Sequence, residues 1–270
     1  MAVKKVRHIL GLSGGKDSTA LAIHVRERLP EMEYVFCDTE KELPETYEYL
    51  SRLETFLGKR ITWLKHDGRG FDHWMVVYRG YLPSPQNRWC TKHLKLKPYE
   101  EYIGDDEVIS YVGIRADEDR EGLISTKPNI KTVFPFKEDG IAKEDVFRIL
   151  EDSGIGIPEY YKWRSRSGCY FCFFQQKIEW VGLYENHRDL FELSQEYEKI
   201  DSEDGKDFTW CQEETLGDII SMDRMNQIKE DNKKRMELMR QKRPKARLVE
   251  LFEDVVEEDS YDEACLICQL

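Results

Sequence analysis

The chain has 270 residues, of which 40% are apolar and 35% are charged, and its net charge is −12. This length suits one elaborated domain, or a nucleotide-binding domain with a smaller appendage, and the composition is that of a globular protein. The acidic balance excludes a chain that clamps nucleic acid over its whole surface, and the sequence contains no apolar run long enough to predict a membrane span.

Apolar runs alternate with helical patterns through the first half of the chain. The N-terminal residues lead directly into the first run without the apolar core of a signal peptide, so we expect a cytoplasmic protein. Helical patterns cover residues 19–29, 45–57 and 146–150, and Gly58 and Gly154 follow the last two as natural helix stops. The runs that predict strands are residues 6–12, 34–38, 61–64, 108–114 and 133–136.

Alternating strands and helices predict an α/β fold, with a parallel sheet and helices on both faces. The strand signals fade after about residue 158, and residues 178–200 and 216–241 each follow the pattern of one long helix. We therefore expect two domains, an α/β domain over residues 1–158 and a mainly helical, cysteine-bearing region over residues 159–270.

The strongest motif lies between the first predicted strand and the helix after it. Its two glycines let the backbone turn sharply and approach a ligand, and the N–H groups of the turn and of the helix N-terminus face an anion. Its serines add hydroxyl donors, its lysine adds a positive charge, and its aspartate can orient Mg²⁺. These candidate nucleotide-binding residues are Ser13, Gly14, Gly15, Lys16, Asp17 and Ser18.

The spacing of the glycines excludes a Walker A loop, and the G-x-G-x-x-G of Rossmann dinucleotide sites is absent. The sequence Ser-Gly-Gly-Lys-Asp-Ser closely resembles the PP-loop of the ATP pyrophosphatases, the adenine nucleotide α-hydrolase superfamily. The resemblance implies a Rossmann-like, HUP-type sheet of five parallel strands and a domain over residues 1–158 that binds ATP and Mg²⁺. It also implies ATP cleavage between the α- and β-phosphates, with Lys16 and Asp17 catalytic. A tight turn without a ligand is the alternative.

Other segments resemble the phosphoadenosine phosphosulfate (PAPS) reductase family. The segment around Asp38 is similar to the family's second strand, and Gly113, Arg115 and Arg120 match its G-x-R-x-x-E stretch with a later arginine. The resemblance implies that these four residues contact the nucleotide and that Arg115 is catalytic. Two guanidinium groups at the carboxyl edge of a sheet could hold phosphate or sulfate. The alternatives are that Asp38 caps a turn and that the arginines are surface charges.

The resemblance spans about residues 6–200, but the sequence departs from the assimilatory reductases in two places. The glycine turn keeps the ATP-type motif, which the reductases have altered to take a preformed sulfonucleotide. The chain also ends in Cys-Leu-Ile-Cys-Gln-Leu, without their E-C-G-x-H-type catalytic segment. Both departures favour the ATP-activating sulfurtransferase branch, such as DNA phosphorothioation and tRNA thiolation enzymes. A thiol-dependent sulfonucleotide reductase and a non-catalytic nucleotide-binding or redox-sensing subunit are the alternatives.

The chain has seven cysteines, which in a cytoplasmic protein do not suggest disulfides. Cys169 and Cys172 form a C-x-x-C pair that can present two thiolates to one metal, within a segment similar to the family's R-x-G-C-x-x-C element. The resemblance makes Cys90 a candidate third ligand, and Cys268 could be the fourth or could form a mobile sulfur-carrying pair with Cys265. The resemblance favours a [4Fe–4S] cluster, with zinc or inert buried cysteines as alternatives.

An ATP-type loop implies an acceptor oxygen to be activated, and basic residues flank Cys90. We therefore expect a nucleic-acid acceptor, either tRNA or DNA, and a sulfur donor such as a cysteine desulfurase or a thiol reductant, with no membrane partner. A small sulfonucleotide or a protein is the alternative acceptor. Residues 233–247 carry eight basic residues and residues 250–263 eight acidic ones, which we interpret as a solvated helix face and a solvated tail, with a local polyanion site as alternative.

Overall fold

The fold described here is that of a computed structural model, which divides into two compact units. The structure describes residues 6–119, 127–200, 208–212 and 214–259. The first unit comprises the described residues among 6–74 and 89–159, and the second those among 75–88 and 160–259. The segment 75–88 thus belongs with the second unit, which no feature of its sequence indicated.

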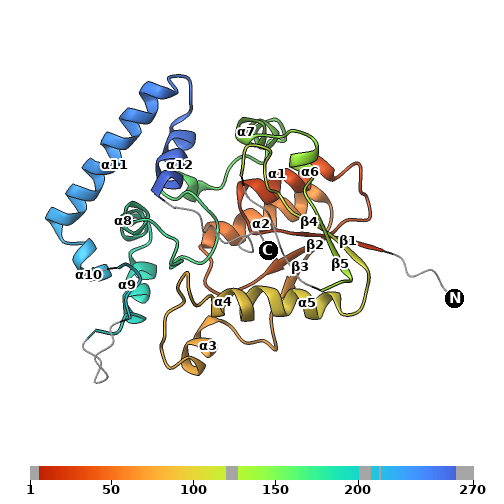
Figure 1. Cartoon of the computed structure of the whole chain (residues 1–270), viewed down its shortest axis with the longest axis horizontal. Helices are drawn as coiled ribbons and strands as arrows, with labels where there is room; N and C mark the ends of the chain where they lie inside the picture. Colours follow the sequence, from red (N-terminus) through yellow and green to blue (C-terminus); the bar gives the residue numbers. More distant parts are fainter. Residues whose placement is uncertain (1–5, 120–126, 201–207, 213, 260–270) are drawn as a thin grey trace. The chain divides into compact units, whose positions relative to one another are not determined.

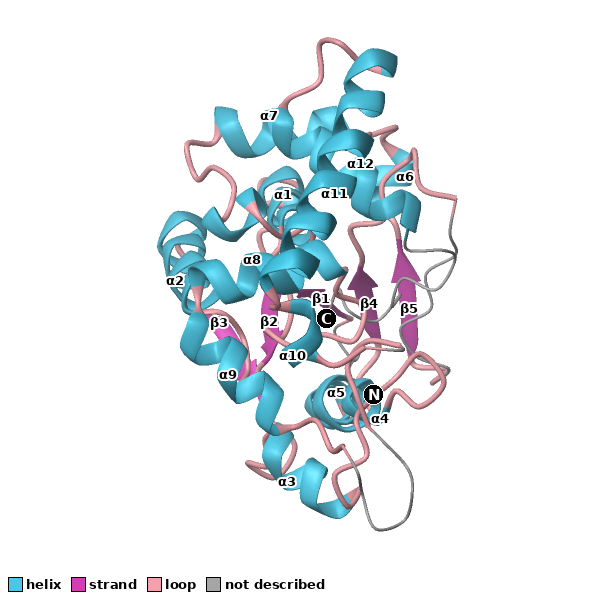
Figure 2. Ribbon diagram, turned by 90° about the vertical axis from the view of Figure 1, so that its left-hand side faces the viewer, coloured by secondary structure: helices cyan, strands magenta, loops and turns pink. Residues whose placement is uncertain are grey.

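The first unit is built on a parallel sheet with the strand order β3-β2-β1-β4-β5 (Figures 1 and 2). The order runs outward from β1 in both directions, so the topological switch point lies between β1 and β4. This confirms the predicted five-stranded, Rossmann-like α/β fold. The strands are β1 (Arg7–Gly11), β2 (Glu33–Cys37), β3 (Ile61–Leu64), β4 (Val108–Tyr111) and β5 (Ile130–Val133).

Successive strand residues point to opposite faces of the sheet and fill two separate cores. Leu10 and Phe36 are buried with apolar residues of α1, α2 and α7, whereas Ile9 and Val35 are buried with those of α5. Helices therefore cover both faces, as Figure 1 shows. The helices are α1 (Lys16–Val25), α2 (Pro44–Leu57), α3 (Phe71–Val77), α4 (Trp89–Thr91), the π-helix η1 (Lys92–Leu96), α5 (Lys97–Ile103), α6 (Pro135–Glu138) and α7 (Lys143–Asp152); α3 runs into the second unit.

Three boundaries predicted in this unit were wrong. The last strand is β5, not residues 133–136, because Pro135 has the fixed φ of a first helical residue and begins α6. The first helix is not residues 19–29, since α1 begins at Lys16 within the glycine turn and ends at Val25. β4 ends at Tyr111, although the N–H of Val112 still donates to the carbonyl of Val133 at 3.1 Å.

The described residues of the second unit are mainly helical, as predicted. Both long helices predicted here are broken, because His187 and Ser221 have non-helical backbone angles and each caps a new helix. Across the described residues of the whole chain, we find no helix with the length and apolar character needed to cross a membrane. The elements are the 3₁₀ turn η2 (Glu159–Lys162), α8 (Lys177–Asn186), α9 (Arg188–Glu196), α10 (Leu216–Ile219), α11 (Met222–Lys242) and α12 (Leu248–Asp259).

The first part of the basic run lies in α11, and acidic residues 250–259 lie in α12, which packs against α11. Met239, Leu251 and Val255 are buried together between them, and Arg243 donates to Asp254 at 3.0 Å. The basic run is largely exposed, as predicted. The prediction of a solvated acidic tail was wrong for the described side chains of residues 250–255, because Leu251 and Val255, four residues apart, are buried and give α12 an inward face.

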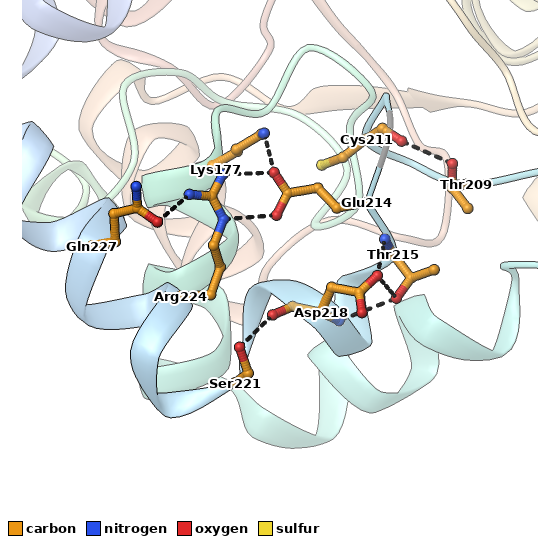
Figure 3. A network of polar contacts seen from close by, with 9 residues as sticks. All are labelled: Lys177, Thr209, Cys211, Glu214, Thr215, Asp218, Ser221, Arg224 and Gln227. Atoms are coloured by element: carbon orange, nitrogen blue, oxygen red, sulfur yellow. Dashed lines mark hydrogen bonds and ion pairs between the residues drawn. The ribbon is translucent and has the colours of Figure 1, made fainter.

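The half-buried carboxylate of Glu214 forms ion pairs with Lys177 of α8 and Arg224 of α11 (Figure 3). Arg224 donates to both carboxylate oxygens of Glu214, at 2.7 and 2.8 Å, and Lys177 pairs with the same carboxylate. Hydrogen bonding from Arg224, together with Lys177, lowers the pKa of Glu214 to about 2 from an ordinary value of 4.5. The folded protein therefore favours the ionised form of this carboxylate more strongly than the unfolded chain does.

This depressed pKa predicts an acid-sensitive contribution to stability. The stabilisation is complete above about pH 5 and is lost as the pH falls toward 2, because the unfolded chain then takes up the proton first. We expect Glu214→Gln to lower the free energy of unfolding by about 1 kcal/mol at pH 7. Urea unfolding of the wild type and of Glu214→Gln should show that the difference in their free energies of unfolding shrinks as the pH is lowered from about 6 to about 3. A difference that grows as the pH falls would contradict the assignment.

Candidate nucleotide site and cysteine loop

The glycine turn connects β1 to α1 at the carboxyl edge of the sheet. Gly14 has a φ of 72°, and a Cβ there would lie 2.6 Å from Cγ2 of Thr46, so only glycine fits. The Ser18 hydroxyl accepts from the N–H of Ser13 at 3.2 Å and lies 3.1 Å from the Ser13 hydroxyl. These contacts fix the turn and place Lys16 and Asp17 in the first turn of α1.

Asp17 lies at the centre of a cluster of charges. Its Oδ2 accepts from Nζ of Lys16 at 2.9 Å, and its Oδ1 accepts from Nη1 of Arg115 at 3.1 Å. Arg115 is 4% exposed and also pairs with Asp117 and Glu118. Burial alone would raise the pKa of Asp17, but the charges of Lys16 and Arg115 hold it well below its usual value. Asp17 is therefore an ionised carboxylate at neutral pH.

Arg115 reaches Asp17 because the strands that precede them, β1 and β4, are neighbours at the switch point. The segment after β4 also approaches the glycine turn closely, since a Cβ on Gly113 would lie 3.1 Å from the carbonyl oxygen of Asp17. Open α/β sheets bind ligands in the crevice outside this point. The structure thus brings together eight of the predicted nucleotide-site residues, namely Ser13, Gly14, Gly15, Lys16, Asp17, Ser18, Gly113 and Arg115.

The close approach at Gly113 predicts that any side chain there displaces the start of α1. We expect Gly113→Ala to lower the free energy of unfolding by about 1–3 kcal/mol, because backbone atoms of Asp17 must shift, and to weaken ATP binding. Gly217→Ala is the matched control, since its Cβ would meet nothing closer than 3.4 Å and lies in a helix. Thermal unfolding and ATP titration measure both effects, and equal behaviour of the two variants would refute the predicted displacement.

Asp38 is not part of this cluster. Asp38 follows β2, where it accepts from Tyr47 at 3.0 Å and from the N–H of Glu40 at 2.9 Å and pairs with Lys65 at 3.0 Å. These contacts cap the turn after β2, which is the simpler of its two sequence interpretations, and among the described residues none joins it to Asp17. Arg120 lies outside the described residues.

The five described cysteines fall into two classes. Cys37 and Cys211 are buried, and burial raises the pKa of each thiol to about 12, so neither is a thiolate at neutral pH. Cys90, Cys169 and Cys172 are half-buried and not disulfide-bonded. Metal ligation requires thiolates, so the three partly accessible cysteines are the ones suited to it, and they are three of the four predicted ligands.

Two fully buried charges hold the loop that carries Cys169 and Cys172. Arg164 donates to the carbonyl oxygens of Gly168 and Cys169, at 3.1 and 2.6 Å. Glu179 accepts from the N–H and hydroxyl of Ser165, at 2.6 and 2.8 Å, and from the N–H of Gln176 at 2.8 Å. One carboxylate therefore binds both ends of the loop, which we call the cysteine loop (residues 165–176).

A short turn inside this loop connects the two cysteines. The N–H of Cys172 donates to the carbonyl of Cys169 at 3.2 Å, a tight connection suited to two thiolates that share one metal. Among the described residues, no three or more His, Cys, Asp or Glu side chains gather as a ready metal site. Cys268 and Cys265 lie outside that part of the chain, and Cys90 belongs to the other unit.

Sequence reasoning missed Arg164 and Glu179. Arg164 carries no signal, because its partners are main-chain carbonyls that any sequence offers. Glu179 did carry one: it stands three residues after Gln176, at the start of an apolar helix, which is the spacing of a capping box. Gly182 allows α8 to pack closely against Trp163, since a Cβ there would lie 2.7 Å from the Trp163 ring.

Comparisons with known proteins identify the family of the chain. A family model of the phosphoadenosine phosphosulfate reductase domain matches residues 7–172. An uncharacterized protein of Methanocaldococcus jannaschii is 25% identical over 191 residues, covering 66% of this chain and 44% of that protein. The tRNA-specific 2-thiouridylase MnmA of Haemophilus ducreyi is 25% identical over 187 residues, covering 56% and 48%. The chain thus spans less than half of either relative.

Two solved structures are also similar. The phosphoadenylyl-sulfate (PAPS) reductase of Candida auris, in a phosphate complex, has a TM-score of 0.49 at 13% identity, covering 62% of this chain and 83% of that one. The U34-tRNA thiolase NcsA of Methanococcus maripaludis, with its [4Fe–4S] cluster, has a TM-score of 0.38 at 14% identity, covering 72% and 71%. Because the family match includes the sheet, the glycine turn, Arg115 and both cysteines of the C-x-x-C pair, the chain belongs to the phosphoadenosine phosphosulfate reductase domain family.

Proposed function

We propose that this chain is an ATP-dependent, sulfurtransferase-like enzyme that cleaves ATP to AMP and pyrophosphate and thereby activates an acceptor oxygen. The observation that carries the proposal is the Asp17 cluster at the switch point of the sheet. A glycine turn, a helix N-terminus, and two cations around one carboxylate suit a triphosphate with its metal ion.

Each residue of the cluster has a separate role in the proposed reaction. The N–H groups of the glycine turn and the hydroxyls of Ser13 and Ser18 bind phosphate oxygens, and Lys16 neutralises their charge. Arg115 stabilises the negative charge that builds up on the α-phosphate during attack. Asp17, kept ionised by its neighbours, would be the oxygen ligand that holds Mg²⁺, and the ion would offset the charge of the phosphates.

We propose that Cys90, Cys169, Cys172 and Cys268 hold a [4Fe–4S] cluster. The fit rests on three partly accessible thiols and on a loop whose shape is fixed by buried charges. A cluster of this kind supplies thiolate-bound iron that can carry electrons or bind sulfur. The chain's own contribution is to hold Cys169 and Cys172 at a fixed spacing through Arg164 and Glu179, with Phe171 and Tyr170 buried beside them.

The acceptor we propose is a nucleic acid, tRNA or DNA, supplied with sulfur by a cysteine desulfurase or a thiol reductant in the cytoplasm. The similarity to a tRNA-specific 2-thiouridylase supports it. The acceptor oxygen attacks the α-phosphate, and pyrophosphate leaves. Sulfur at the sulfide level then attacks the carbon or phosphorus atom that carries the adenylated oxygen, and AMP leaves with that oxygen.

A thiol-dependent PAPS reductase is the second candidate, favoured by the family model that matches the chain. Nucleotide preference separates the two. We expect ATP with Mg²⁺ to bind more tightly than PAPS in calorimetric titration of the protein, because the glycine turn is built for a triphosphate. A clear preference for PAPS would favour the reductase. Tight ATP binding without pyrophosphate release, with tRNA or DNA present, would indicate a non-catalytic subunit.

A further inference from the structure

Two arginines approach the same aromatic ring of the cysteine loop. The guanidinium carbon of Arg88 lies 5.2 Å from the centre of the Phe174 ring, and that of Arg166 lies 5.8 Å from it. The Phe173 ring is adjacent, with its centre 4.4 Å from that of Phe174. All four side chains are half-buried and belong to the second unit, so each keeps part of its surface exposed.

The buried carboxylate of Glu179 fixes this arrangement. Glu179 binds Ser165, which directly precedes Arg166, and Gln176, which follows Phe174 by two residues. The arginine and the ring are thus held together by the same contact that closes the cysteine loop. Arg88 comes from residues 75–88, a separate segment of the chain within this unit. The backbone next to Arg166 and Phe174 is therefore held by a buried contact before any ligand binds.

The charges of this group favour an anion. The ring quadrupole attracts both guanidinium groups but does not neutralise their charge. Arg166 forms no ion pair with any carboxylate in the described part of the chain, so its charge is balanced only by the ring and by solvent. A phosphate beside Arg166 would supply the missing counter-charge and could accept hydrogen bonds from its guanidinium group.

We propose that Arg88, Arg166, Phe173 and Phe174 form a docking site for a single-stranded nucleic acid. The arginines pair with backbone phosphates, and an unpaired base stacks on the exposed surface of the two rings, a combination that tolerates any base. Three of the four residues lie within the cysteine loop. Arg166, Phe173 and Phe174 are each three residues or fewer from Cys169 or Cys172 along the sequence. This inference rests on the proposed function, since it assigns the surface that receives the acceptor.

Fluorescence anisotropy with labelled single strands of RNA and of DNA tests the site directly, without ATP. We expect Arg166→Ala to weaken binding about tenfold and to lower the slope of log affinity against log salt by about one. Phe174→Leu should weaken binding with the slope unchanged, because it removes stacking and no charge. Arg188→Ala is the matched control, since Arg188 also lies over an aromatic ring of this unit, 5.1 Å from Tyr184, and should leave affinity unchanged.

The arms of the experiment separate the possible ligands. A preference for RNA over DNA, or the reverse, identifies the source of the strand and supports the site in either case. Binding that is equal in wild type, Arg166→Ala and Phe174→Leu overturns it, as does tighter binding of duplex than of single strands or the absence of any strand binding by the wild type. Pyrophosphate release from ATP is measured separately, so the docking site can fail while the proposed reaction stands. Circular dichroism checks that each variant folds.

Discussion

Asp17→Asn should lower the rate of pyrophosphate release from ATP by about 10³-fold while ATP still binds. The substitution keeps the shape of the side chain but removes the charge that orients Mg²⁺. It also leaves Lys16 and Arg115, 3% and 4% exposed, beside an uncharged amide. We therefore expect a loss of about 1–3 kcal/mol in the free energy of unfolding as well. Steady-state pyrophosphate assays and urea unfolding measure the two effects.

Asp231→Ala provides the control for this variant. Asp231 is an exposed carboxylate whose ion pair with Lys234, at 3.7 Å, is long and solvated, so its removal should change neither rate nor stability measurably. Asp17→Ala should reproduce the loss of activity with a larger loss of stability, because it removes the remaining hydrogen-bond acceptor. If Asp17→Asn turned over ATP at the wild-type rate, Asp17 would be a structural counter-ion and not part of the catalytic machinery.

Cys169→Ser should abolish the iron–sulfur cluster. Protein purified without oxygen is expected to be brown and to contain iron and sulfide in equal amounts, and the variant is expected to be colourless. The physical reason is that an alcohol is not deprotonated at neutral pH and is a poor ligand for iron. Iron and sulfide analysis, with the visible absorption spectrum, gives the result without any measurement of activity.

Cys211→Ala is the matched control for the cluster. Cys211 is buried, and burial raises its thiol pKa to about 12, so we expect it to contribute no ligand and the variant to keep the colour. Cys90→Ser should lose or weaken the cluster if the third ligand is assigned correctly. Colourless wild-type protein that holds one zinc ion per chain would contradict the cluster and make the site a structural one.

The glycine turn was predictable because its requirements are local. Only glycine allows the φ of 72° at Gly14, and the motif must follow a strand and open a helix, both of which can be identified from the sequence. The contact between Asp17 and Arg115 spans 98 residues of chain and depends on β1 and β4 being neighbours. Pattern alone does not give that pairing, so only the family resemblance brought Arg115 to the site.

Other features could not be predicted because competing local and tertiary effects decide them. The helical spacing of apolar residues continues across His187 and Ser221, so the sequence pattern predicted one helix where the structure has two. The charge of residues 250–259 suggested a solvated tail, but burial of Leu251 and Val255 outweighs it. The role of Arg164 depends on main-chain partners in a folded loop, and no property of its sequence neighbours distinguishes it.

The position of bond cleavage in ATP is the most direct test of the central claim. ATP labelled in both its α- and γ-phosphates, incubated with the protein, Mg²⁺ and either unmodified tRNA or DNA, is separated by chromatography. The arrangement of the glycine turn, Asp17 and Arg115 predicts labelled pyrophosphate in an amount equal to the α-label found in AMP and in adenylated acceptor together, with both formed about 10³-fold more slowly by Asp17→Asn. Labelled ADP with orthophosphate would show cleavage at the γ-phosphate and would contradict the account.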